Sequence, residues 1–158
     1  MVNRDLMATL PGRDALILMA DDRGQVYVAM PDGRWHGNSV TVDDPDDLEG
    51  LAEFDDAATV LTAVADAAQS TIMELLWQAW PVCWVHRIGM HPRPAGTASD
   101  SYPGETEATG PPVWWCRGSR DGNGHDVSLV GELADTLPGK QRRALRRDER
   151  RRERDGRR

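Results

Sequence analysis

WPVCWVHRIGMH (Trp80–His91) and PVWWCRGSRDGNGHDVSLVGEL (Pro112–Leu133) are the two stretches that decide the fold of this chain. They contain both cysteines of the protein and three of its four histidines. Five of the six tryptophans also lie in or beside them. Because a buried tryptophan removes roughly 150–250 Å² from water, we expect this region to form much of the local core.

The spacing of the cysteines and histidines is typical of a metal site. Cys83-x-x-His86 places a thiol and an imidazole on one tight turn. Cys116 ends a predicted strand, and a glycine-rich turn leads from it to His125 at the start of the next strand. Structural zinc takes four thiolate or imidazole ligands in a tetrahedron, all from protein. We therefore predict a structural zinc site made of Cys83, His86, Cys116 and His125, with His91 as an alternate ligand.

Two other interpretations of the cysteines stay open. Free cysteine is among the most buried residue types, so Cys83 and Cys116 could be two core thiols in the same shape without a metal. A disulfide would require an oxidising compartment.

The pattern resembles a zinc ribbon, in which two hairpin turns clamp one ion. It is also similar to short actinobacterial proteins of unassigned role that carry a WPxCxxH stretch followed by WWC…GH…GEL. The resemblance covers about a third of the chain and implies a fold rather than an activity. The matching residues are Trp80, Pro81, Cys83, His86, Trp114, Trp115, Cys116, Gly124, His125, Gly131, Glu132 and Leu133.

The N-terminal half predicts an α+β arrangement. Short apolar runs at 15–20 and 25–30, separated by four turn-forming residues, indicate a β-hairpin. A weaker run at 38–42 extends it to a three-stranded antiparallel meander. Apolar residues at steps of three and four then predict one long helix over about 54–79, which Pro81 ends. We expect this helix to cover the sheet and its last-turn tryptophans, Trp77 and Trp80, to point toward the metal site.

These elements suggest three parts. An α+β domain spans 1–80, and a zinc-ribbon-like β module spans 81–137. Residues 92–112 are rich in Pro, Gly, Ser and Thr and are expected to form a flexible loop within that module. A basic tail, helical or disordered, spans 138–158.

Charge divides the chain at the tail. Residues 139–158 hold eleven basic and four acidic residues, a net +7, and since the whole chain carries −7 the first 138 residues carry −14. The bland interpretation is that body and tail attract one another. The functional one is nucleic-acid binding through counterion release. Its candidate residues are Arg142, Arg143, Arg146, Arg147, Arg150 and Arg151.

The sequence contains few signs of catalysis. It has neither the H-E-x-x-H nor the H-x-E…C-x-x-C pattern of catalytic zinc, and no P-loop or G-x-S-x-G elbow. No apolar run is long enough to cross a bilayer, and no secretory leader is recognisable, so we expect a cytoplasmic protein without a membrane partner. The favoured function is a non-catalytic binding or adaptor protein with an unidentified protein partner. A nucleic-acid-associated regulator is the alternative, and a small metal-dependent enzyme a third.

Overall fold

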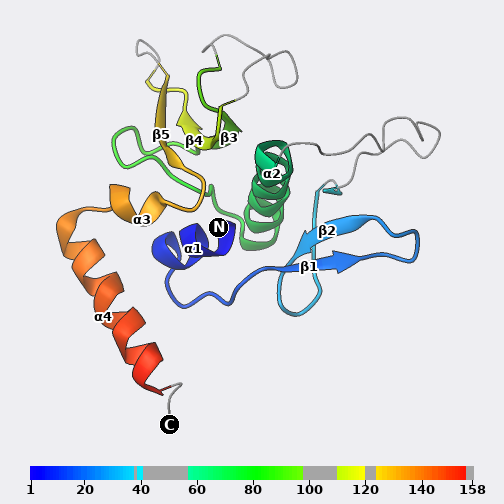
Figure 1. Cartoon of the computed structure of the whole chain (residues 1–158), viewed down its shortest axis with the longest axis horizontal. Helices are drawn as coiled ribbons and strands as arrows, with labels where there is room; N and C mark the ends of the chain where they lie inside the picture. The colour runs from blue at the N-terminus through cyan, green and yellow to red at the C-terminus, as the bar shows by residue number, and fades with distance from the viewer. Residues whose placement is uncertain (38, 41–56, 98–109, 120–123, 156–158) are drawn as a thin grey trace.

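The computed structural model describes residues 1–37, 39–40, 57–97, 110–119 and 124–155. The expected α+β class is confirmed: a two-stranded and a three-stranded antiparallel sheet lie on either side of one long helix (Figure 1). The elements in chain order are α1 (Val2–Thr9), β1 (Ile17–Ala20), β2 (Val26–Ala29), α2 (Ala57–Leu76), β3 (His91–Pro94), β4 (Pro112–Cys116), β5 (His125–Leu129), α3 (Leu133–Thr136) and α4 (Gly139–Asp155).

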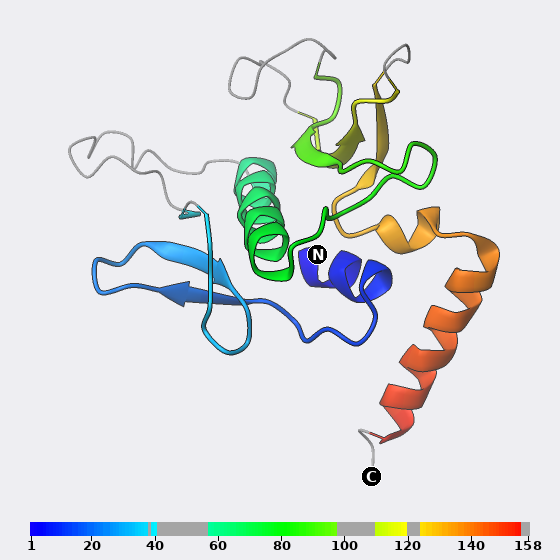
Figure 2. The same ribbon diagram turned by 180° about the vertical axis from the view of Figure 1, so that it is seen from behind.

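Helix α2 is the central element, and the views from the front and from behind both place it between the two sheets (Figures 1 and 2). Its predicted apolar stripe is buried at Ala65, Ala68 and Ile72. Two buried polar side chains reach in opposite directions from it. Thr71 Oγ1 lies 2.8 Å from the carbonyl oxygen of Val28 in β2. The amide of Gln69 donates to the carbonyl oxygens of Trp80 and Met90 on the other side.

The N-terminal hairpin forms where the sequence predicts it. β1 and β2 pair antiparallel from Ile17↔Ala29 to Ala20↔Val26. The carboxylate of Asp21 accepts hydrogen bonds from the backbone of Arg23 and Gln25, both at 2.9 Å, and so holds the turn. Directly after β2, Ala29 forms an isolated bridge with Trp35. Most of the predicted third strand at 38–42 lies outside the described residues.

The predicted C-terminal end of the long helix is wrong. α2 ends at Leu76 rather than near residue 79, because Trp77 adopts a left-handed conformation with φ 52°. A left-handed residue commonly ends a helix, although glycine usually occupies that position. The side chain of Trp77 is 90% exposed, so it does not point toward the metal site as expected, whereas Trp80 is buried. The predicted start at 54–56 lies outside the described residues.

The three-stranded sheet has the order β3-β4-β5. β3 overlaps the start of the stretch 92–112 that we expected to be a loop, so that expectation is wrong at its N-terminal end. Proline lacks an N–H for the ladder and is confined to edge strands, and β3, with Pro92 and Pro94, lies at the edge of the sheet. Pro112, the other end of the expected loop, belongs to β4. Residues 98–109 lie outside the described part of the chain.

An N-terminal helix that the sequence analysis missed connects the two ends of the chain. Asp5 of α1 is fully buried, and its carboxylate accepts three hydrogen bonds. The donors are Trp114 Nε1 at 2.7 Å, the backbone N–H of Gly131 at 2.6 Å and that of Leu133, the first residue of α3, at 2.8 Å. Burial raises the pKa of Asp5, and the three hydrogen bonds and the N-terminal amine oppose that rise. Asp5 thus joins α1 to the sheet and to α3.

One hydrophobic core joins elements from both halves of the described chain. One cluster of buried residues includes Leu6 of α1, Val28 of β2, Ile72 of α2 and Trp114 of β4. The predicted division into 1–80 and 81–137 remains a prediction. None of the described helices is long and apolar enough to span a bilayer.

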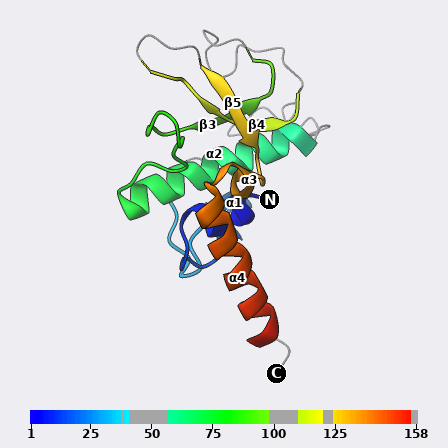
Figure 3. The same ribbon diagram turned by 90° about the vertical axis from the view of Figure 1, so that its left-hand side faces the viewer.

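The basic tail is helical over most of its length. α4 runs without interruption over Gly139–Asp155 and extends away from the rest of the molecule (Figures 1 and 3). It begins directly after Pro138, whose carbonyl oxygen accepts the N–H of Gln141 at 2.8 Å.

Candidate metal centre

The first half of the centre is a tight hairpin at residues 81–90. Val82 and Gly89 form an isolated β-bridge. The N–H of Cys83 donates to the carbonyl oxygen of Ile88, and the N–H of Arg87 donates to the carbonyl oxygen of Cys83, both at 2.9 Å. Arg87 adopts a left-handed conformation with φ 59°, which turns the chain directly after His86. The turn brings Cys83 Sγ to 3.7 Å from His86 Nδ1.

The second half is the β4–β5 hairpin. The register shifts by one residue between Trp114 and Trp115, so Cys116 pairs with His125 rather than with Asp126. An extra residue in one strand is a β-bulge, a feature that re-aims side chains. The backbone N–H of Gly118 donates to Cys116 Sγ at 3.4 Å. The bulge therefore places the thiol and the imidazole directly opposite each other.

The two hairpins bring the four predicted ligands together. One ligand atom from each of Cys83, His86, Cys116 and His125 lies within 4.8 Å of all the others. Cys116 Sγ lies 3.4 Å from His86 Nδ1, close to the 3.7 Å from Cys83 Sγ. With Zn–S near 2.3 Å and Zn–N near 2.0–2.1 Å, tetrahedral ligand atoms are separated by about 3.3–3.8 Å. The donor set and its spacing fit one zinc ion after a contraction of at most about 1.5 Å in any ligand–ligand distance.

His91, the alternate ligand, lies outside this group. It is exposed at the start of β3, opposite Trp115 in the register. The remaining predicted site residues, the arginines between 142 and 151, all lie on α4.

Burial shapes the chemistry of the two thiols. Cys83 and Cys116 are free thiols, 1% and 0% exposed, while His86 and His125 are half-buried. Burial raises the pKa of Cys116, and so does the neighbouring Cys83, while the N–H of Gly118 and the charge of Arg117 oppose this. A coordinated zinc ion reverses this preference, because it deprotonates a ligating thiol outright.

Tryptophans support the centre from both sides. Trp80, just before the first hairpin, meets Trp114 edge to face with ring centroids 5.3 Å apart. The Arg93 guanidinium makes a cation–π contact with the Trp115 indole, 4.1 Å from the ring centroid. The same indole lies directly against Gly124, so a side chain at Gly124 would collide with it. Because Gly124 directly precedes His125, the indole restricts the position of the backbone next to this histidine ligand.

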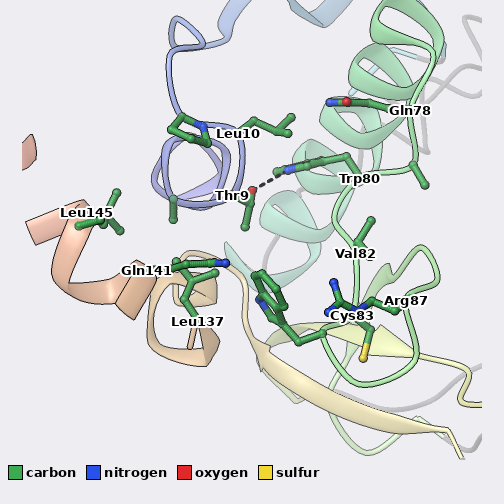
Figure 4. Close-up of a pocket in the computed structure, with 15 residues that line it drawn as sticks. Thr9, Leu10, Gln78, Trp80, Val82, Cys83, Arg87, Leu137, Gln141 and Leu145 are labelled. Carbon is green, nitrogen blue, oxygen red and sulfur yellow. Dashed lines mark hydrogen bonds between the residues drawn. The ribbon is translucent and has the colours of Figure 1, made fainter. Parts of the chain in front are cut away.

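A cavity of about 530 Å³ opens beside the first hairpin, between α1, residues 78–87, and the chain from Leu137 to Leu145 (Figure 4). Two of its lining residues are joined by a hydrogen bond, in which Trp80 Nε1 donates to Thr9 Oγ1 at 2.8 Å. Its described lining contains one charged side chain, Arg87, and neither a carboxylate nor an imidazole. The sequence analysis missed this cavity, because no local pattern indicates that α1 and α4 meet the hairpin.

Comparisons with protein families, with curated proteins and with solved structures find no match for this chain. The features of the molecule that bear on its function are the Cys₂His₂ cluster and its surroundings. Those surroundings are two facing hairpins, the side chains of Trp80, Trp114 and Trp115, and a mainly apolar cavity.

Proposed function

We propose that Cys83, His86, Cys116 and His125 hold one structural Zn²⁺ in a zinc-ribbon-like arrangement, and that the protein is a non-catalytic binding or adaptor protein. The observation that carries this proposal is the convergence of four thiol and imidazole donors within 4.8 Å. Zinc sites with four protein ligands are structural, whereas catalytic sites keep one position for water or substrate.

Each residue of the centre has a role in this proposal. Cys83 and Cys116 bind as thiolates, and His86 binds through Nδ1, the ring nitrogen that faces both sulfur atoms. The N–H of Gly118 stabilises the negative charge on Cys116 Sγ. The ion joins the two hairpins, and metal binding is then part of the free energy of folding.

The surroundings favour binding over catalysis. The cavity beside the centre offers no carboxylate or imidazole among its described lining residues, and the one thiol that reaches it, Cys83, is committed to the metal. A concave, mainly apolar surface with few polar groups is typical of a binding site. Trp84 and Arg87, which also meet in a cation–π contact 5.2 Å from the ring centroid, are side chains of the types enriched at interfaces.

Metal content per chain is the test. The untagged protein, purified without chelator, should contain about one zinc per chain, and Cys83→Ser and Cys116→Ser should each lose it together with cooperative thermal unfolding. His91→Ala is the matched control, since it removes an exposed imidazole outside the cluster and should keep the full metal content. Wild-type protein without metal would contradict the proposal. Loss of zinc in His91→Ala would show that the ligand set is wrong.

A further inference from the structure

Four arginines form one face of α4. Arg147, Arg150, Arg151 and Arg154 follow the spacing i, i+3, i+4, i+7, which places side chains on the same side of a helix. All four are exposed, and together they line a hollow of about 440 Å³. None of the four forms an ion pair with any side chain that the structure describes. We call these residues the arginine face.

The arginines of this face repel one another, and a bound anion would offset that repulsion. Like charges three and four residues apart destabilise a helix by about 0.2–0.5 kcal/mol per pair. Arginine prefers planar, bidentate contacts with phosphate or carboxylate oxygens. The arginine face is therefore suited to a partner that supplies several phosphate groups at once.

We propose that α4 binds the phosphate backbone of double-stranded DNA through the arginine face. The helix has 17 residues, about 25 Å at 1.5 Å per residue, and the major groove of B-DNA admits an α-helix. The major groove of duplex RNA is too narrow for this. Single strands are usually held by stacking on aromatic side chains, and α4 has none.

The remaining charges orient the protein on DNA. The first 138 residues carry −14, so the body is repelled by phosphates while α4 extends from it (Figure 3). A membrane surface is a poorer partner, because the only apolar side chains of α4 are Ala144 and Leu145, and both line the cavity beside the metal centre. The inference goes beyond the proposed zinc-dependent adaptor, and its test does not depend on the metal.

The test is fluorescence anisotropy of the full chain, as purified, with a labelled 20-base-pair duplex at several salt concentrations. One variant replaces all four arginines of the arginine face by glutamine. Its matched control replaces four exposed arginines of the body by glutamine and so changes the net charge by the same amount. These are Arg4, Arg13, Arg23 and Arg34. Four phosphate contacts predict a slope of log K against log salt of about −3.6 from the arginine face. The variant should lose that slope and bind at least about tenfold more weakly at low salt, while the control keeps both.

Three results would overturn the inference. The first is equal binding of DNA by the arginine-face variant and the wild type. The second is an equal loss in the control, which would reduce the effect to net charge. The third is competition by single-stranded DNA, duplex RNA or phosphatidylserine vesicles at the same phosphate concentration as effective as that by duplex DNA. Far-UV circular dichroism should be unchanged in both variants, because all eight arginines are exposed.

Discussion

Replacing Asp5 by alanine should be among the most destabilising single changes in this protein outside the metal centre. The carboxylate is fully buried and accepts hydrogen bonds from Trp114 Nε1 and from the backbone N–H groups of Gly131 and Leu133. Alanine leaves all three donors buried without an acceptor. Each such donor costs about 1–3 kcal/mol.

The three donors together set a range of about 3–9 kcal/mol. Part of that is offset, because alanine also removes a carboxylate whose ionised form is disfavoured by burial, as its raised pKa shows. We therefore expect a loss of about 3–5 kcal/mol in the free energy of unfolding, close to the cost of removing one partner of a buried pair. Since domains of this size are stable by about 5–15 kcal/mol, the variant should be marginally folded.

Urea unfolding followed by tryptophan fluorescence measures the effect, at fixed metal loading. Asp14→Ala, which removes an exposed carboxylate, is the control and should change stability by less than about 0.5 kcal/mol. A loss below about 1 kcal/mol in Asp5→Ala would refute the argument, because it would mean that water or a shifted backbone satisfies the three donors.

The pH dependence of the same site gives an independent check with Asp5→Asn. The folded-state pKa is raised above 3.8, so on acidification the folded protein takes up the proton before the unfolded chain does. The wild-type advantage over Asp5→Asn should therefore grow as the pH falls from 7 through the folded-state pKa toward 3.8. An advantage that shrinks on acidification would mean that the hydrogen bonds outweigh desolvation.

Three further changes test other contacts. Gly124→Ala should lower the free energy of unfolding by about 1–3 kcal/mol in a urea titration, and should weaken metal binding, because the added methyl group forces the adjacent indole aside. Gly89→Ala, whose added methyl group meets only ordinary contacts, should lower the free energy of unfolding by under about 1 kcal/mol in the same titration. Gln69→Leu should cost about 2–3 kcal/mol in chemical unfolding, because two buried carbonyl oxygens lose their donor, and a neutral result would contradict that accounting. Trp77→Gly should raise the melting temperature, since it relieves a left-handed conformation and removes a side chain that is 90% exposed; a lower melting temperature would show that the indole is packed.

The sequence predicts the features that depend on a local pattern or on a rare residue type. With only two cysteines and four histidines in 158 residues, the spacing of Cys83, His86, Cys116 and His125 sufficed to identify the cluster. The regular apolar steps sufficed for α2, and the turn residues for the β1–β2 hairpin.

Features that depend on distant partners could not be predicted in the same way. β3 contains two prolines and has no alternating pattern, and it is a strand because β4 offers it an edge. The bulge that pairs Cys116 with His125 has no local signal, and the helix end at Trp77 uses a conformation that sequence rules assign to glycine. Asp5 reads locally as an ordinary surface acid, and only the tertiary structure reveals its three donors.

The contacts of Asp5 also bear on the order in which the chain assembles. Its three partners lie 109, 126 and 128 positions further along the sequence. Contacts between such distant residues form slowly, because a long loop must close before they stabilise anything. During synthesis α1 leaves the ribosome before all three partners, so its carboxylate gains its first donor only when Trp114 has emerged and its last only when Leu133 has. We therefore expect α1 to dock late, so that this part of the nascent chain stays open to chaperones and proteases until Leu133 has been made.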